Sequence, residues 1–237
     1  METTKRVLGE EHPDTLTSMA NLALTYWNLG WWKEAEQLGF QVLETTKRVL
    51  GEQHPDMLTS MANLASTYWN LGVWKEAEQL FVQVLEMRKR VLGEEHPDTL
   101  TSMGNLALTY WNLGWWKEAE QLGVQVLEMR KRVLGEEHPD TLTIMANLAS
   151  TYRNLGRWKE AEQLFVQVLE MRKRVLGEEH PDTLTSMNNL AHTLKSQGQD
   201  KKAISLMKNT VNLLIKQLGP THPNTIHSLN NLNIWQK

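Results

Sequence analysis

The sequence predicts an all-α fold, a right-handed α–α superhelix of about five helix-turn-helix repeats followed by a closing helix. Two observations predict this fold class. The tripeptide His-Pro-Asp recurs at a constant interval of 42 residues, and each interval holds two stretches whose apolar residues lie three and four positions apart. Such strict spacing indicates one helical hairpin stacked along an axis, so that each copy packs against its neighbours.

The tripeptide sets the expected boundaries of the repeats. It begins at His12, His54, His96, His138 and His180, and an altered copy, His-Pro-Asn, begins at His222. We expect a single solenoid over 1–237. Its expected parts are the end of a truncated helix at 1–11, the repeats 12–53, 54–95, 96–137, 138–179 and 180–221, and a capping helix at 222–237.

The N-terminal segment predicts that the chain begins inside a helix. Residues 2–10 match residues 44–52 letter for letter, and residues 44–52 lie at the end of a predicted second helix. We therefore expect the chain to be a piece of a longer protein, with more repeats or an NTPase domain upstream. A longer natural reading frame would support this expectation, and a native start and stop at these ends would contradict it.

The first helix of each repeat is predicted from its start, its stripe and its end. Pro13 suits the first helical position because its φ is fixed and its missing N–H needs no partner, and His12 takes the N-cap position before it. Gly30 can adopt the left-handed conformation that ends helices. The apolar stripe between them consists of Leu16, Met19, Leu22, Ala23, Tyr26 and Leu29.

The second helix is predicted from a similar stripe. Lys47 and Arg48 lie in its last turn, where cations oppose the helix dipole, and Gly51 stops it. Thr46 interrupts the apolar side. That side consists of Trp32, Ala35, Leu38, Val42, Leu43, Val49 and Leu50. The loops are short, so consecutive helices are expected to pack antiparallel.

Composition excludes several classes of function. The net charge is −3, which gives no reason to expect a nucleic acid or an acidic membrane as partner. The absence of cysteine removes disulfides, thiolate metal sites and a cysteine nucleophile, and it fits a reducing, cytoplasmic location. No apolar run approaches the length of a membrane span, so no membrane is expected as a partner.

The repeats resemble the tetratricopeptide repeat. The similarity is carried by the string NLALTYWNLGWWKEAEQLGFQVL from Asn21 to Leu43, in which the packing positions of that signature are Leu22, Ala23, Tyr26, Gly30, Trp32 and Ala35. The 42-residue period is most similar to the longer repeats of kinesin light chains and of the repeat tails of fungal and bacterial NB-ARC and NACHT signalling NTPases. The chain departs from the family at Gly39 and Gly123, because the family often has a large residue at this position of the repeat. The second and fourth repeats have the large residues Phe81 and Phe165 there.

Residues with catalytic or metal-binding chemistry do not converge. The repeated histidines stand one per hairpin, so they cannot surround one metal ion, and the repeated glutamates resemble ordinary surface charge. The Arg-Lys-Arg runs that begin at Arg88, Arg130 and Arg172 are interpreted as charges that oppose the helix dipole. A phosphate or nucleic-acid contact is the alternative for these runs. We expect no enzyme, no cofactor and no metal.

One face of the first helices is the candidate binding site. In tetratricopeptide arrays, which this chain resembles, the face opposite the buried stripe lines a concave groove that holds extended peptides. An asparagine amide both donates and accepts hydrogen bonds, which suits a sequence-tolerant grip on a peptide backbone. Two rows of asparagines follow this face: Asn21, Asn63, Asn105, Asn147 and Asn189, and Asn28, Asn70, Asn112 and Asn154. The alternative is that these side chains bond to neighbouring helices or to water.

Aromatic and cationic residues extend the same candidate site. Trp27, Trp69 and Trp111 are replaced by Arg153 and Lys195 in later repeats, and Arg157 precedes a second helix. Tryptophan and arginine commonly anchor partners, so an acidic or aromatic segment is the expected ligand. Partial burial is the alternative for the tryptophans. It fits the cations less well, because burying an unpaired cation is costly.

The predicted function is a protein–protein interaction module that binds an extended peptide or partner segment in its concave groove. The alternative is a structural, self-associating scaffold, or the sensor tail of a larger signalling protein similar to the NB-ARC and NACHT NTPases. Nearly identical repeats make end-to-end association easy, and a monomer in solution would weaken this alternative.

Overall fold

The computed structural model describes residues 6–236, which form two compact units within Met1–Trp115 and Trp116–Lys237. Residues 1–5 of the expected truncated helix lie outside this range, and residues 6–8 are helical. The first unit contains α2 (Pro13–Asn28), α3 (Trp32–Leu50), α4 (Pro55–Asn70), α5 (Trp74–Leu92) and α6 (Pro97–Asn112). The second contains α7 (Trp116–Leu134), α8 (Pro139–Asn154), α9 (Trp158–Leu176), α10 (Pro181–Ser196), α11 (Asp200–Leu218) and α12 (Pro223–Trp235). The all-α repeat fold is confirmed.

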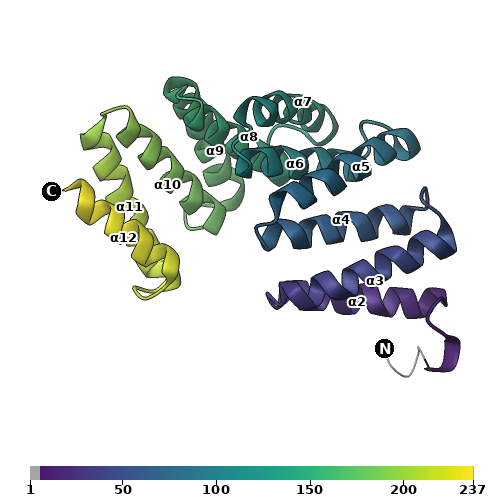
Figure 1. Ribbon diagram of the computed structural model, residues 1–237. Coiled ribbons are helices and arrows are strands. Elements are labelled where there is room, and N and C mark those ends of the chain that lie inside the picture. Colours follow the sequence, from purple (N-terminus) through teal and green to yellow (C-terminus); the bar gives the residue numbers. More distant parts are fainter. Residues whose placement is uncertain (1–5, 237) are drawn as a thin grey trace. The chain divides into compact units, whose positions relative to one another are not determined.

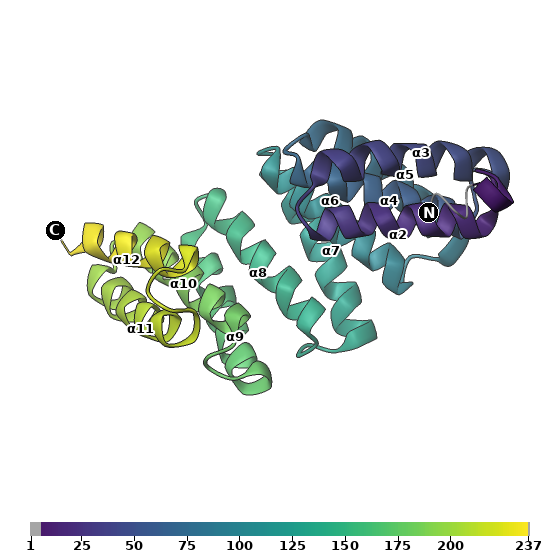
Figure 2. The ribbon, with the colours of Figure 1, turned by 90° about the horizontal axis from the view of Figure 1, so that it is seen from below.

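Within each unit, consecutive helices pack side by side. In the first unit the chain of contacts runs from α2 through α3, α4 and α5 to α6 (Figure 1). In the second it runs from α7 through α8, α9, α10 and α11 to α12 (Figure 2). The first helices of neighbouring hairpins also touch, α2 with α4 and α8 with α10, and we refer to the layer of first helices in each unit as the inner layer.

The histidine N-caps are confirmed. The Nδ1 atom of His12 accepts a hydrogen bond from the backbone N–H of Asp14 at 3.2 Å, and the proline follows at the first turn. The same bond occurs at the five other copies, from His54 to His222. Each cap satisfies one of the N–H groups that a helix start leaves without a partner.

Glycines end the helices as predicted. Gly30 has a φ of 76° beyond the end of α2, and the N–H of Trp31 donates to the carbonyl of Tyr26 at 2.9 Å. This left-handed glycine and the backward bond satisfy the last carbonyls of the helix. The chain can therefore reverse within a few residues, which brings α3 back against α2.

The apolar stripes form the core, with corrections. Leu16 and Met19 of α2 and Leu38 and Val42 of α3 are buried. Leu29, Trp32 and Val49, all expected in the stripes, are exposed, because they lie at or next to helix ends. Thr46 does not interrupt the buried side, because its side chain is only 3% exposed.

The interpretation of the Arg-Lys-Arg runs is wrong for the first arginine of each run. Arg88, Arg130 and Arg172 are buried. The guanidinium of Arg88 donates to the carbonyl oxygen of Asp98 at 3.0 Å and to Ser102 Oγ at 2.9 Å, which joins α5 to the next first helix, α6. A helix face that looks charged in sequence is buried here because the polar start of the following helix supplies the acceptors.

Candidate partner-binding site

The predicted asparagines lie on the first helices. The side-chain amides of the first row, which runs from Asn21 to Asn189, are free. Asn21 and Asn63 are exposed, and Asn105, Asn147 and Asn189 are half-buried. Within residues 6–236, none of these five side chains has a hydrogen-bond partner. Their amides therefore remain available to donate to and accept from another chain.

The second row of asparagines is partly engaged. Asn70 Nδ2 donates to the carbonyl of Ser66 at 2.8 Å, and Asn112 Nδ2 donates to the carbonyl of Leu108 at 2.9 Å. These bonds run back along the same helix. Asn70 and Asn112 thus offer mainly their side-chain oxygens to a partner, while Asn28 and Asn154 have no such bond among the described residues.

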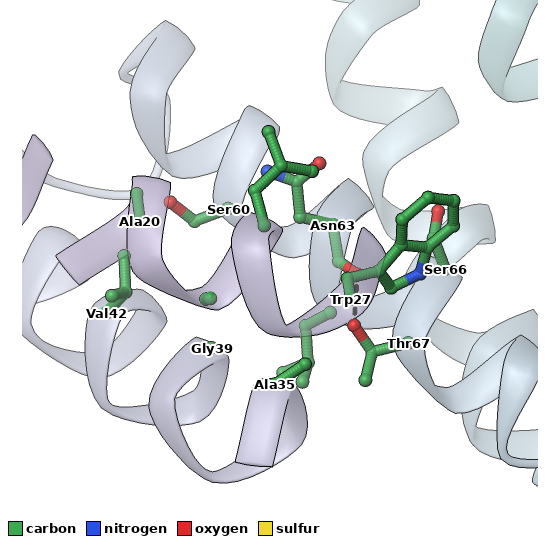
Figure 3. A pocket seen from close by; sticks show the side chains of 12 residues that line it. Ala20, Trp27, Ala35, Gly39, Val42, Ser60, Asn63, Ser66 and Thr67 are labelled. Carbon is green, nitrogen blue, oxygen red and sulfur yellow. Dashed lines mark hydrogen bonds between the residues drawn. The ribbon is translucent and has the colours of Figure 1, made fainter. Parts of the chain in front are cut away.

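A cavity of about 160 Å³ opens on the inner layer between α2, α3 and α4. Figure 3 shows Ala35 and Gly39 of α3 across from Trp27 of α2, with Asn63 of α4 close by. The walls are mostly small or apolar side chains. The lining residues are Ala20, Ala23, Leu24, Trp27, Ala35, Gly39, Val42, Ser60, Asn63, Leu64, Ser66 and Thr67.

Gly39 accounts for the open space. The equivalent residues in the second and fourth repeats are Phe81 and Phe165, and both are fully buried. Gly39 has no side chain to fill the corresponding volume, and an added Cβ would meet Leu64 Cδ1 at 3.5 Å. The alternation of glycine and phenylalanine is visible in the sequence. The cavity itself depends on how α2, α3 and α4 pack around Gly39.

A second cavity of about 250 Å³ brings several predicted residues together. It lies farther along the first unit, between α2, α4, α5 and α6. Its lining residues are Trp27, Ser66, Trp69, Asn70, Phe81, Asn105 and Leu108. Trp27 lines both cavities, so they adjoin each other along the inner layer.

The predicted tryptophans combine packing with exposure to these cavities. Trp27, Trp69 and Trp111 are half-buried, and Trp27 and Trp69 line the cavities. The indole Nε1 atoms of all three are buried and have no hydrogen-bond partner within residues 6–236. A buried N–H without an acceptor is costly, so these groups gain if an acceptor reaches them.

Arg153 stands apart from the other predicted cations. It is half-buried on α8, and no acidic side chain within residues 6–236 pairs with it. Burial lowers the pKa of Arg153. The pKa of His192 on α10 is also lowered, by burial and then by the charges of Arg153 and His227. The inner layer of the second unit therefore holds positive charge that lacks a counter-ion.

Arg157 and Lys195 are already paired. Arg157 donates to Glu120 and Glu160 and lies 4.3 Å from the centre of the Tyr152 ring. Lys195 Nζ donates to Asp200 Oδ1 at 2.9 Å. The Glu120 contact could not be foreseen, because Glu120 belongs to the preceding hairpin.

Metal-binding side chains do not cluster in the described part of the chain. Within residues 6–236, no three His, Asp or Glu side chains gather as a metal site would require. No helix in that range is long and apolar enough to cross a membrane.

Comparisons with known proteins agree with the repeat architecture. A tetratricopeptide repeat model matches residues 63–132, 105–173 and 140–214, and a second tetratricopeptide repeat model matches residues 15–56. A search of curated proteins found no match.

Solved structures show the same fold. The crystal structure of nearly identical TPR-like repeats from a Podosopora anserina protein, assigned as a kinesin light chain, is 34% identical, with a TM-score of 0.74. That match covers 86% of this chain and 97% of the other. BtubC of P. vanneervenii is 22% identical, with a TM-score of 0.75 and coverage of 94% and 89%. A Rap protein complexed with competence and sporulation factor is 12% identical, with a TM-score of 0.69 and coverage of 98% and 71%.

The two lower identities show the fold alone, whereas the family models and the 34% identical repeats show the family. The chain therefore belongs to the tetratricopeptide repeat family, and its repeats are of the kinesin-light-chain-like type.

Proposed function

We propose that the inner layer of the first unit binds an extended segment of a partner protein, and that one apolar side chain of this segment enters the cavity beside Gly39. The observation that carries the proposal is this open cavity of about 160 Å³, with the unpartnered amide of Asn63 on its lining. A cavity of about 150 Å³ lined by apolar side chains holds a benzene molecule, so a leucine or phenylalanine side chain is of suitable size.

The asparagines supply the grip on the backbone of the segment. An extended chain presents N–H and C=O groups at regular intervals, and each free amide can satisfy one of each. Asn63 lines the first cavity and Asn105 lines the second, so a free amide is present at each of the two cavities of the first unit. Backbone bonds give affinity with little dependence on sequence, while the cavity selects one side chain.

In the second unit, separately from the segment bound by the first unit, an acidic residue of a partner is proposed to pair with Arg153. This guanidinium is half-buried without a carboxylate, and its charge helps to lower the pKa of the neighbouring His192. A carboxylate would offset the cost of burying the cation and would form charge-assisted hydrogen bonds. Lys195 and Arg157 contribute less, because each already has an acidic partner.

The comparisons support a binding role at the level of the fold. The Rap structure, which shares the fold, holds the competence and sporulation factor. Helical repeat arrays use their extended inner surfaces for binding, and unrelated partners share the same fold. The chemistry of the bound segment therefore follows from the residues of the site and not from the partners of the relatives.

A peptide-library selection tests the proposal. Peptides would be selected on the intact chain and then measured on Gly39→Phe, which carries the residue of the second and fourth repeats. We expect selected peptides to share an apolar residue and to lose about tenfold or more in affinity for Gly39→Phe, because burying a leucine-sized side chain contributes about 1.5–3 kcal/mol. Phe40→Val is the matched control, since Val124 stands there in the third repeat and Phe40 does not line this cavity.

Two outcomes contradict the proposal. The first is a selection that yields no binders on the intact chain. The second is equal affinity of the selected peptides for the intact chain and for Gly39→Phe, with circular dichroism showing that the variant is folded.

Self-association is the second candidate function, and the surface of α12 favours it. Ile226, Leu229 and Ile234 are exposed on this helix, although Leu16 and Met19, which correspond to the first two, are buried in α2. Sedimentation velocity should then show a dimer or larger species that the double variant Ile226→Lys, Leu229→Lys dissociates. A monomer at all concentrations contradicts this candidate.

A further inference from the structure

A larger cavity lies on the other side of α4. It measures about 450 Å³ and is bounded by α3, α4 and α5. Met57, Met61 and Tyr68 of α4 line it, whereas Ser60, Asn63, Ser66 and Thr67 line the cavity of the inner layer. Only Leu64 borders both. The two cavities therefore open on different sides of one helix, and a partner in one leaves the other accessible.

One end of this larger cavity is anionic. Burial raises the pKa of the Tyr68 hydroxyl, and the carboxylates of Glu36 on α3 and Glu76 on α5 raise it further. Within residues 6–236, neither Glu36 nor Glu76 forms an ion pair. Two carboxylates thus act on the Tyr68 hydroxyl, and Glu76 lines the cavity together with Tyr68. We refer to Glu36, Tyr68 and Glu76 as the acidic niche.

The second unit contains the same niche with a cation inside it. Two repeats later along the chain, Glu120, Tyr152 and Glu160 occupy the positions of Glu36, Tyr68 and Glu76. The guanidinium of Arg157 fills this copy. It bonds to both glutamates, one through Nε at 2.8 Å, and its carbon lies 4.3 Å from the centre of the tyrosine ring.

Val73 is the residue that leaves the first niche open. It occupies the position of Arg157, where a valine has neither charge nor the length to reach two carboxylates. Other repeats fill this position differently. Trp31 stacks on Tyr26 with ring centres 5.7 Å apart, and Gln199 donates to Glu162 at 3.2 Å. Among these repeats, the one with Val73 has both glutamates, Glu36 and Glu76, and no side chain at this position that can bind to them.

We infer that the acidic niche binds the guanidinium of an arginine on a partner protein, and that an apolar side chain next to this arginine occupies the adjoining cavity. The partner segment is therefore basic and apolar, opposite in charge to the acidic residue proposed for Arg153. Arg157 shows the geometry, in which the planar group bonds to two carboxylates while one face lies on the ring. An ammonium cannot reproduce both contacts, because it lacks the planar fork of donors.

The size and lining of the cavity fit the apolar part of this ligand. Its volume lies in the range of about 300–1,000 Å³ that is usual for ligand sites. Phe40 is 51% exposed at its wall, and Met57 and Met61 provide flexible, polarizable surface. The single lysine on its lining, Lys47, is held by Glu52 at 2.8 Å, so it does not neutralise the niche.

Nuclear magnetic resonance of tyrosine rings tests the inference. The chain has four tyrosines, so ¹³C-tyrosine labelling gives few signals, and Tyr68→Phe assigns the one of interest. The probe is N-acetyl-arginine amide, extended to a Leu-Arg-Leu tripeptide. N-acetyl-citrulline amide, which has the same shape without the charge, is the control. We expect the arginine probes to shift the Tyr68 signals and to leave those of Tyr152 in place, and the citrulline probe to shift neither.

Two variants make the test reciprocal. Val73→Arg supplies the chain's own guanidinium, and we expect it to weaken the probe at Tyr68 by about tenfold or more. Arg157→Val empties the second niche, and we expect Tyr152 to begin responding to the probe. Gly39→Phe should leave the Tyr68 response unchanged, which separates this site from the inner layer.

The inference is overturned if Tyr68 fails to respond to the arginine probes. It is also overturned if citrulline shifts Tyr68 equally, or if Val73→Arg binds as well as the original chain.

Discussion

Replacing Gly39 with alanine should stabilise the protein while weakening its binding to a partner. Gly39 lies in the interior of α3, where glycine is less stable than alanine by about 0.5–1 kcal/mol because its backbone loses more freedom on folding. The new methyl group would meet Leu64 Cδ1 at 3.5 Å, an ordinary van der Waals distance, so no strain offsets the gain. A gain of this size corresponds to about 1–4 °C in melting temperature for a chain of this length.

The cost should appear in binding. The methyl group occupies part of the cavity that the partner's apolar side chain is proposed to enter. If it displaces about one methylene group of that side chain, affinity falls by about 0.8 kcal/mol, or about fourfold in Kd. The space that Gly39 leaves for a ligand would then explain why this position has a glycine, although glycine lowers the stability of the helix.

The assay combines urea denaturation with titration of a selected peptide, and Gly30→Ala is the control. Gly30 has a φ of 76°, so alanine there should destabilise by about 1–2 kcal/mol without entering the cavity. The reasoning is refuted if Gly39→Ala lowers the free energy of unfolding, or if it raises stability and leaves peptide affinity unchanged.

Three further predictions concern the packing and the second unit. His192→Gln should reduce the loss of stability as pH falls through about 6.5, because the folded-state pKa of His192 lies below this ordinary value and the unfolded chain therefore takes up more protons. Equal dependence of the unfolding free energy on pH in both proteins would contradict this. Ser102→Ala should lower the free energy of unfolding by about 1–3 kcal/mol, because it removes an acceptor from the buried guanidinium of Arg88. Arg88→Leu on the same background should recover part of this loss. An unchanged denaturation midpoint in Ser102→Ala would show that the bond contributes nothing. His54→Ala should lower the free energy of unfolding by about 0.5–2 kcal/mol, and His54→Asp by much less, since aspartate also caps helices. Hydrogen exchange of the amides at the start of α4 measures this difference. Equal protection of these amides in the two variants would contradict the capping role.

Local features could be predicted because their partners are close in sequence. The cap at His12 depends on an N–H two residues later, and the turn at Gly30 depends on carbonyls within the preceding helical turn. The helix starts and ends, and with them the hairpin fold, follow from such short-range patterns. Repetition adds the information that neighbouring hairpins pack against each other.

Features that depend on neighbouring hairpins could not be predicted. The acceptors of Arg88 lie on the next first helix, so its run of charges resembled an exposed helix end. Arg157 was expected on the inner layer, but its partner Glu120 comes from the preceding hairpin. The cavity beside Gly39 requires three helices in register, although the glycine itself was visible in the sequence.

Photo-crosslinking tests the central claim most directly. A peptide selected on the intact chain would carry photo-leucine at its shared apolar position, and the crosslinked residues would be identified by mass spectrometry. The account predicts crosslinks to Leu24, Trp27 or Leu64 around the cavity, and their loss in Gly39→Phe. Crosslinks that fall elsewhere, or that persist unchanged in Gly39→Phe, would contradict it.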